Sequence, residues 1–102
     1  MATTNSDQAF DDLHRLIKKG DRAKVRAWVE SGADVNLRNR YGWSVLMLAA
    51  LHGRTDIAEE LLAAGADASV ENDFGDTAVS LARIKGFDRT VHILERRTRD
   101  GV

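Results

Sequence analysis

The feature that most constrains this sequence is a spacing of 33 residues between its glycines. Seven of the eight glycines fall on this lattice, namely Gly20, Gly53 and Gly86, then Gly32 and Gly65, then Gly42 and Gly75. Apolar residues keep the same spacing, as Trp28, Leu61 and Leu94 do. A fixed period of this length, with helical periodicity inside each unit, indicates a repeat protein whose units bury their apolar faces against one another.

Inside each repeat, the spacing of apolar residues predicts two helices joined by a short turn. Phe10, Leu13 and Ile17 fall on one face of the first helix. Gly20 ends this helix, because a left-handed residue costs least when it has no side chain. The same reasoning predicts helices over residues 7–19, 22–31, 45–51, 54–64, 77–85 and 87–97, with caps at Ser6, Asp21 and Ser44.

The segment from Gly32 to Trp43 lacks helical periodicity but contains Asn36, Asn39 and Gly42. These residue types favour turns, so the segment is predicted to be an extended, β-hairpin-like loop that projects from the helices. A second loop of this kind is expected one period later. The predicted fold class is therefore an all-α solenoid of helix-turn-helix repeats with two projecting loops.

Composition excludes several classes of protein. The chain has 102 residues, enough for one domain, and a net charge of −1, which disfavours binding to nucleic acid or to a membrane surface. It contains no cysteine, so disulfides and thiolate chemistry are excluded. No apolar run is long enough to span a bilayer, and no signal peptide is evident at Met1. We therefore expect a cytoplasmic protein.

The central repeat carries a recognisable motif. It reads Asn39-Arg40-Tyr41-Gly42-Trp43-Ser44-Val45-Leu46-Met47-Leu48-Ala49-Ala50, followed by Gly53, Leu61-Leu62 and Gly65-Ala66-Asp67. This pattern resembles the ankyrin repeat family. The resemblance implies an ankyrin-type solenoid of three repeats over residues 6–38, 39–71 and 72–102, preceded by a disordered tail over residues 1–5.

The chain departs from the family pattern in its turns and in its outer repeats. Where the family has a proline and a histidine, Val45 and Met47 stand in the second repeat and Ala78 and Ser80 in the third. Because the turn-bracing histidine is missing, we expect these turns to be less rigid.

In the third repeat, Arg83 replaces the second alanine of the motif and Glu95 replaces the second leucine. Such a polar outer side is what a terminal, capping repeat needs. His14, Arg15, Lys18 and Lys19 are expected to give the first repeat the same character.

No catalytic or metal-binding constellation is evident. His14, His52 and His92 are dispersed along the sequence and are expected on helix surfaces. Ser44, Thr55, Thr77 and Ser80 are better explained as caps and turn residues than as nucleophiles. The protein is therefore predicted not to be an enzyme and to need no cofactor.

The resemblance implies that a protein partner is held by the loop tips and by the exposed side of the first helix of each pair. Carried onto this sequence, these positions are Arg40, Tyr41, Trp43, Leu51, His52, Asp73, Phe74, Asp76, Ile84 and Lys85. The residues support this choice independently, because Tyr41, Trp43 and Phe74 are aromatics in segments expected to be exposed. The alternative is structural, since Tyr41 and Phe74 could stack between loops, and Trp43, Leu51 and Ile84 could pack between repeats.

Charge offers a second indication. The first loop is basic at Arg38 and Arg40, and the second is acidic at Glu71, Asp73 and Asp76, so the two tips could orient a partner. Residues 96–99 are basic and are expected to be a solvated end.

We expect a non-catalytic protein-protein interaction module that acts as scaffold, adaptor or occluding inhibitor. An immunity-type inhibitor of a toxin or enzyme is one alternative, and a self-associating structural protein is another. A monomer is expected in preference to a homo-oligomer.

Overall fold

The computed structural model describes the backbone of residues 5–100 and the side chains of residues 8–97. Within this part of the chain there are six helices and no strand. They are α1 (Asn5–Lys19), α2 (Arg22–Glu30), α3 (Val45–Leu51), α4 (Thr55–Ala63), α5 (Ala78–Lys85) and α6 (Asp88–Asp100). The predicted all-α fold is confirmed.

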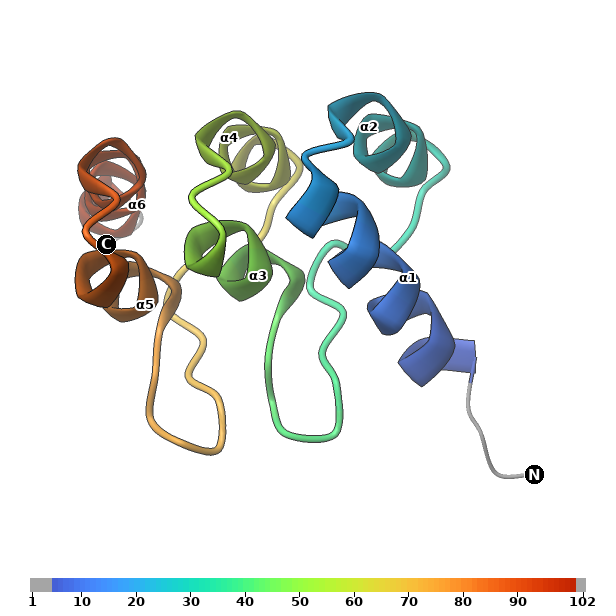
Figure 1. Ribbon diagram of the computed structural model, residues 1–102, viewed down its shortest axis with the longest axis horizontal. Helices are drawn as coiled ribbons and strands as arrows, with labels where there is room; N and C mark the ends of the chain where they lie inside the picture. The colour runs from blue at the N-terminus through green and yellow to red at the C-terminus, as the bar shows by residue number, and fades with distance from the viewer. Residues whose placement is uncertain (1–4, 101–102) are drawn as a thin grey trace.

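The helices form two layers, as Figure 1 shows. Helices α1, α3 and α5 lie side by side in one layer, and α2, α4 and α6 lie side by side in the other. Two long loops connect α2 to α3 and α4 to α5, and both project away from the second layer (Figure 1). The predicted solenoid with two projecting loops is therefore confirmed.

Helix α3 forms the centre of the core because it packs against both α1 and α5. Its residues 45–50 are all buried, and Ala49 and Ala50 are fully inaccessible. Small side chains at these two positions allow neighbouring helices to approach closely. Phe10, Ile17 and Leu81 complete the apolar contacts on either side of α3. Each repeat thus buries its apolar face against the next one, as the period of 33 predicted.

In the described part of the chain, side chains cap the starts of α2, α3 and α5. Asp21 accepts a hydrogen bond from the backbone N–H of Lys24, and Ser44 accepts one from that of Met47. Thr77 and Ser80 form a reciprocal capping box, with N–H to Oγ distances of 2.9 and 3.1 Å. Ser80, which replaces the family's histidine, thus braces the third turn by another route.

Each loop is closed by the side chain of one asparagine. Asn39 Oδ1 accepts hydrogen bonds from the backbone N–H groups of Tyr41 and Trp43, at 2.9 and 3.0 Å. One period later, Asn72 Oδ1 accepts from the backbone of Phe74 and Asp76 at 2.9 and 3.0 Å. The loops resemble hairpins without forming strands, because a single antiparallel bridge links Arg38 to Ser44 in the first.

Arg38 holds the two loops together. Its guanidinium donates to the carbonyls of Gly42 in its own loop and Glu71 in the next, and Asp73 N–H donates to Tyr41 O at 2.9 Å. Arg38 therefore has a structural role in addition to the charge that it brings to the first loop.

The glycine between the two helices of a repeat also permits contact with the following repeat. A Cβ added at Gly53 would lie 2.9 Å from the ring of Phe87, and one at Gly20 would lie 3.1 Å from the guanidinium of Arg54. Arg54 and Phe87 are themselves 33 residues apart. Gly86 also has a positive φ, of 79°, but within 4 Å of its Cβ position the described part of the chain places no atom.

Both ends of the helical array differ from the prediction. Helix α1 begins at Asn5, so the start predicted after Ser6 was placed too late, and residues 1–4 of the expected tail lie outside the described residues. Helix α6 extends to Asp100, beyond the predicted end at residue 97. Arg97 donates to the carbonyl oxygen of Leu62 at 2.6 Å, which caps the end of α4. This basic segment is therefore not simply a solvated end.

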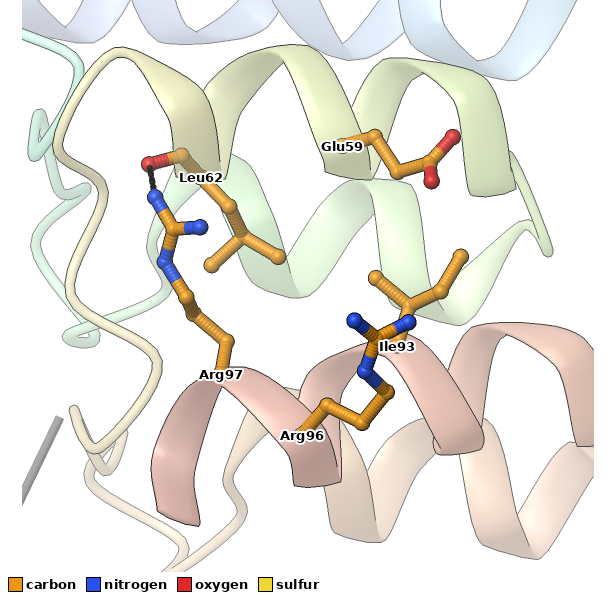
Figure 2. A pocket seen from close by; sticks show the side chains of 5 residues that line it. All are labelled: Glu59, Leu62, Ile93, Arg96 and Arg97. Atoms are coloured by element: carbon orange, nitrogen blue, oxygen red, sulfur yellow. Dashed lines mark hydrogen bonds between the residues drawn. The ribbon is translucent and has the colours of Figure 1, made fainter. Parts of the chain in front are cut away.

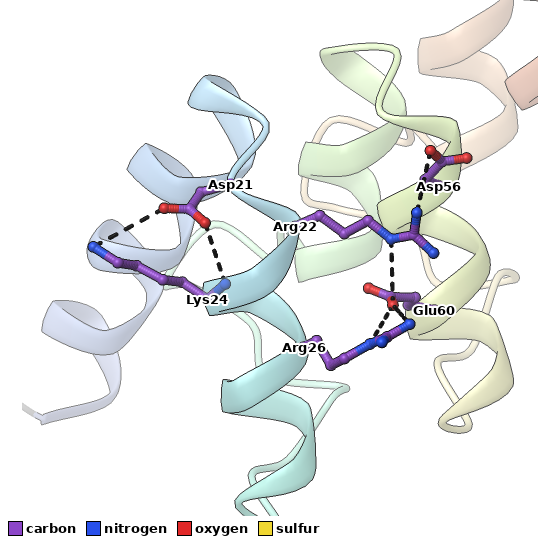
Figure 3. A network of polar contacts seen from close by, with 6 residues as sticks. All are labelled: Asp21, Arg22, Lys24, Arg26, Asp56 and Glu60. Carbon is purple, nitrogen blue, oxygen red and sulfur yellow. Dashed lines mark hydrogen bonds and ion pairs between the residues drawn. The ribbon is translucent and has the colours of Figure 1, made fainter.

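Ion pairs join α2 to α4 in the layer formed by α2, α4 and α6, which we call the outer layer (Figure 3). Glu60 of α4 is largely covered, since only 15% of its side chain is exposed. Its Oε2 accepts from Arg26 Nη2 at 2.7 Å and lies 3.4 Å from Arg22 Nε. The side chain is covered because both arginines reach over it from α2 (Figure 3).

The two residues that break the family pattern in the third repeat are partners of each other. Arg83 of α5 forms an ion pair with Glu95 of α6. At the equivalent positions of the second repeat, Ala50 and Leu62 are buried. The outer side of the third repeat is therefore polar.

Candidate functional site

The sequence-predicted site residues lie on the loop tips and at the ends of α3 and α5. We call these ten positions the candidate surface: Arg40, Tyr41, Trp43, Leu51, His52, Asp73, Phe74, Asp76, Ile84 and Lys85. Three large hydrophobic side chains are exposed in the described part of the chain, namely Tyr41 at 51%, Phe74 at 71% and Ile84 at 75%. All three belong to the candidate surface.

The tips present their aromatic rings separately. Tyr41 and Phe74 do not stack, since the ring pair found among the described side chains is a histidine pair. The Arg40 guanidinium lies 5.8 Å from the centroid of the Tyr41 ring, at cation-π distance. A cavity of about 300 Å³ separates this tip from α1 and is lined by Asp11, Asn39, Arg40 and Tyr41. Asp11 was not predicted to belong to the site.

Four of the predicted site residues make contacts within the fold. Trp43 and Leu51 are half-buried and pack against the core, so little of either side chain is available. Asp76 is half-buried and accepts a hydrogen bond from Asn72 Nδ2 at 3.5 Å. The Asp73 carboxylate lies beside the Cα of Gly42, although the residue is exposed. These positions support the tips more than they extend them.

His52 is paired with His14, which the sequence did not reveal. The two Nε2 atoms are 3.1 Å apart, and the ring centroids are 5.3 Å apart. One imidazole therefore donates and the other accepts. The two histidines are dispersed in the sequence and half-buried near the helix surface, and nothing in the sequence indicated that their rings meet. His14 and His52 are 38 residues apart in the sequence, so they do not follow the 33-residue repeat. The packing of α1 on α3 brings them together.

The surroundings of the histidine pair are electropositive. Burial lowers the pKa of His52 below 6.5, and the charges of His14, Lys18, Arg54 and Lys85 lower it further. Arg54 is held in place because it donates to the carbonyls of Ile17 and Lys18. In the folded state, His52 is therefore more readily neutral than a free imidazole.

A second cavity lies between α4 and α6, on the outer layer. It has a volume of about 210 Å³ and is lined by Glu59, Leu62, Ile93, Arg96 and Arg97 (Figure 2). Arg97 closes one end of it by bonding to the Leu62 carbonyl (Figure 2). The lining holds one carboxylate and no nucleophile, so we assign it no reaction. Among the described side chains, no group of three metal-ligating residues occurs.

The repeat geometry agrees with a family model described as ankyrin repeats in three copies, which matches residues 13–99. The chain belongs to the ankyrin repeat family. Ankyrin repeats are protein-interaction modules, which is the kind of activity that exposed aromatics on paired loops can serve. In the described part of this ankyrin chain, no helix combines the length and the apolar character needed to cross a membrane.

Relatives place these ankyrin repeats in very different proteins. The chain is 34% identical to human mitochondrial disaggregase over 98 residues, which is 96% of this chain and 13% of that protein. It is 39% identical to human protein phosphatase 1 regulatory subunit 27 over 64 residues, 63% of this chain and 42% of that protein. The chain thus spans less than half the length of either relative.

Among solved structures, the ankyrin chain is similar to a chain in a complex from Bdellovibrio bacteriovorus. That complex joins the predatory endopeptidase Bd0816 to the immunity protein Bd3460. The TM-score is 0.78 at 29% identity, covering 83% of this chain and 45% of that one.

Proposed function

We propose that this ankyrin chain is a non-catalytic module that binds a protein partner through its loop tips and the adjacent ends of α3 and α5. The observation that carries the proposal is the placement of exposed hydrophobic residues. Tyr41, Phe74 and Ile84 all lie on the candidate surface. Their apolar area is exposed to water in the unbound protein and would be buried by a bound partner. We further propose that the protein is a cytoplasmic monomer.

Occlusion of an enzyme is the form of activity that we favour. The similarity to a chain in the complex of the endopeptidase and the immunity protein supports this form of activity, because the alignment covers 83% of the present chain. Two loop tips bearing aromatics, flanked by basic helix ends, would cover a site by steric exclusion and need no chemistry of their own. A scaffold or adaptor role uses the same surface and differs only in what the partner does.

The test replaces Tyr41, Phe74 and Ile84 together with alanine. Because these side chains are exposed, the triple variant should keep its helical circular dichroism and its melting temperature. Capture of the partner from the source cell, identified by mass spectrometry and repeated with the purified partner, should weaken by at least about a hundredfold, since truncating each anchor costs more than about 1 kcal/mol.

A matched control changes exposed residues of the outer layer. Glu59→Ala, Arg89→Ala and His92→Ala together should leave capture unchanged, because these residues lie on α4 and α6, outside the candidate surface. Equal loss of binding in both triple variants, or no loss in the first, would contradict the assignment. A mass by light scattering that rises with concentration would favour the self-associating alternative instead.

A further inference from the structure

We propose that the helix ends around the His14 and His52 pair receive an acidic, extended segment of the partner, and that binding of this segment takes up a proton. The inference rests on the proposed function, since it specifies the chemistry of the partner at one part of the same surface. It concerns the ends of α1, α3 and α5, apart from the aromatic loop tips.

The first argument is unbalanced charge. His52 is surrounded by His14 and Lys18 from α1, by Arg54 from the turn before α4, and by Lys85 from α5, and among the described side chains no acidic group offsets these charges. Within residues 8–97, neither Lys18 nor Lys85 forms an ion pair. By contrast, Arg22 and Arg26 of α2 both lie against the carboxylate of Glu60. A carboxylate from another chain would supply the missing negative charge.

The second argument is the shape and chemistry of the neighbouring positions. Leu51 and His52 stand at the end of α3, and Ile84 and Lys85 occupy the equivalent positions of α5. Ile84 is 75% exposed, and Lys85 is exposed beside it. The end of α5 therefore offers an exposed apolar contact next to a cation, and the end of α3 offers a protonatable group beside the half-buried Leu51. An occupant of matching chemistry alternates acidic and apolar residues.

The third argument is spacing. Neighbouring packed helices lie about 8–10 Å apart, and a chain in the extended polyproline II conformation advances about 3.1 Å per residue, with three residues per turn so that residues i and i+3 share a face. An extended segment that crosses from α3 to α5 therefore meets the second helix about three residues after the first. Acidic residues at positions i and i+3 of the partner would reach His52 and Lys85 in turn.

The histidine pair makes this contact depend on pH. In the free protein one Nε2–H lies between the two rings, and the neighbouring cations oppose a second proton. A carboxylate placed beside the pair removes part of that opposition, so the pKa of His52 rises on binding and a proton is taken up. Affinity for an acidic segment should therefore increase as the pH falls from about 8 to about 6.

Stability should move in the opposite direction. Because the folded pKa of His52 lies below 6.5, the unfolded chain binds the proton first as the pH falls. The contribution of neutral His52 to the free energy of unfolding is present above about pH 6.5 and is lost as the pH falls through the folded pKa. A gain in affinity over the same range cannot then be explained by a more stable fold.

The experiment uses a fluorescein-labelled peptide of about twelve residues, long enough to cross three helices, in which glutamate recurs every third residue among leucine and serine. Fluorescence anisotropy on the intact protein should give an affinity about three- to tenfold higher at pH 6 than at pH 8. His52→Gln should abolish this pH dependence, and Lys85→Gln should weaken binding at both values. A peptide of the same composition in scrambled order should bind more weakly.

Two control variants match the substitutions. His92→Gln on α6 and Lys24→Gln on α2 remove the same side chains from the outer layer and should change nothing. An affinity independent of pH, or unaffected by His52→Gln, would overturn the proposal. Equal binding of a single-stranded DNA of the same charge would overturn it in favour of general polyanion attraction, and loss of binding in EDTA would overturn it in favour of a metal bridge.

The peptide assay needs no native partner. Its failure would leave the capture experiment standing, and failure of that capture would not alter the peptide result. The two proposals can therefore be rejected separately.

Discussion

Gly53 must satisfy two requirements at once. Its φ of 66° lies in the left-handed region, and the ring of Phe87 occupies the space where a Cβ would be, 2.9 Å away. Gly86 has the same kind of backbone, with φ of 79°, but has open space around its Cβ position. The two glycines are equivalent in sequence and differ only in whether a described residue of another repeat packs against them.

This difference predicts unequal costs for the same substitution. Gly86→Ala should lower the free energy of unfolding by about 1–2 kcal/mol, the cost of a left-handed residue with a side chain. Gly53→Ala should cost about 1–3 kcal/mol more, because Phe87 must also move. Urea denaturation followed by circular dichroism measures both values. Equal losses would show that the Phe87 ring yields freely.

At the scale of elements, the contact between α2 and α4 depends on charge. Arg26 and Glu60 are joined by two short contacts, 2.8 Å from Nε and 2.7 Å from Nη2, and the glutamate is largely covered. Arg22 and Asp56 face each other across the same pair of helices at 3.6 Å, and both are more than half exposed. Burial of one partner should make the first pair the stronger one, since water screens the second.

A double-mutant cycle tests this ranking. Replacing Arg26 and Glu60 by alanine, singly and together, should give a coupling energy of about 0.5–1 kcal/mol. The same cycle on Arg22 and Asp56 should give about 0–0.3 kcal/mol. Both couplings should shrink in high salt. A larger coupling energy for Arg22 and Asp56 than for Arg26 and Glu60, the two pairs drawn in Figure 3, would contradict the ranking.

Features that depend on local chemistry could be predicted from the sequence. Gly20 and Asp21 mark a helix end and a helix start by their own conformational preferences, and both assignments are confirmed. The period of 33 extended these assignments to the whole array. The same local rules placed Ser44 as the cap of α3, which is also confirmed.

Contacts between repeats could not be predicted in this way. His14 meets His52 because α1 packs against α3 in a register that differs from the repeat period. Glu60 is covered because two side chains of α2 happen to be long enough to reach it. Such pairings depend on relative helix placement, which periodicity does not specify. Of the candidate site, the exposed tips were therefore predictable and the histidine pair was not.

At the scale of the whole molecule, the polar outer side of the third repeat disfavours the packing of a second chain against the end of the array. Arg83 and Glu95 stand where the second repeat buries Ala50 and Leu62. An array with an apolar outer side would expose a surface suited to packing against another repeat. We therefore propose that the third repeat, over residues 72–102, acts as a cap.

Restoring the pattern of the second repeat should remove this protection. The double variant Arg83→Ala and Glu95→Leu is expected to self-associate, because it exposes an apolar strip like the one buried inside the array. Light scattering at increasing concentration should give a mass above that of one chain. Swapping the two charges, with Arg83→Glu and Glu95→Arg, keeps the face polar and should leave a monomer. A monomeric double variant would show that the ion pair is not what keeps copies apart.

The asparagines that close the two loops have a consequence for how this protein could change over time. Asn39 and Asn72 set the course of each loop through backbone N–H groups rather than through the side chains of Arg40, Tyr41 and Phe74. Arg40, Tyr41 and Phe74 can then be exchanged for many other residues without loss of the fold. Specificity could drift toward a new target by substitutions at the tips while the supporting framework stays constant.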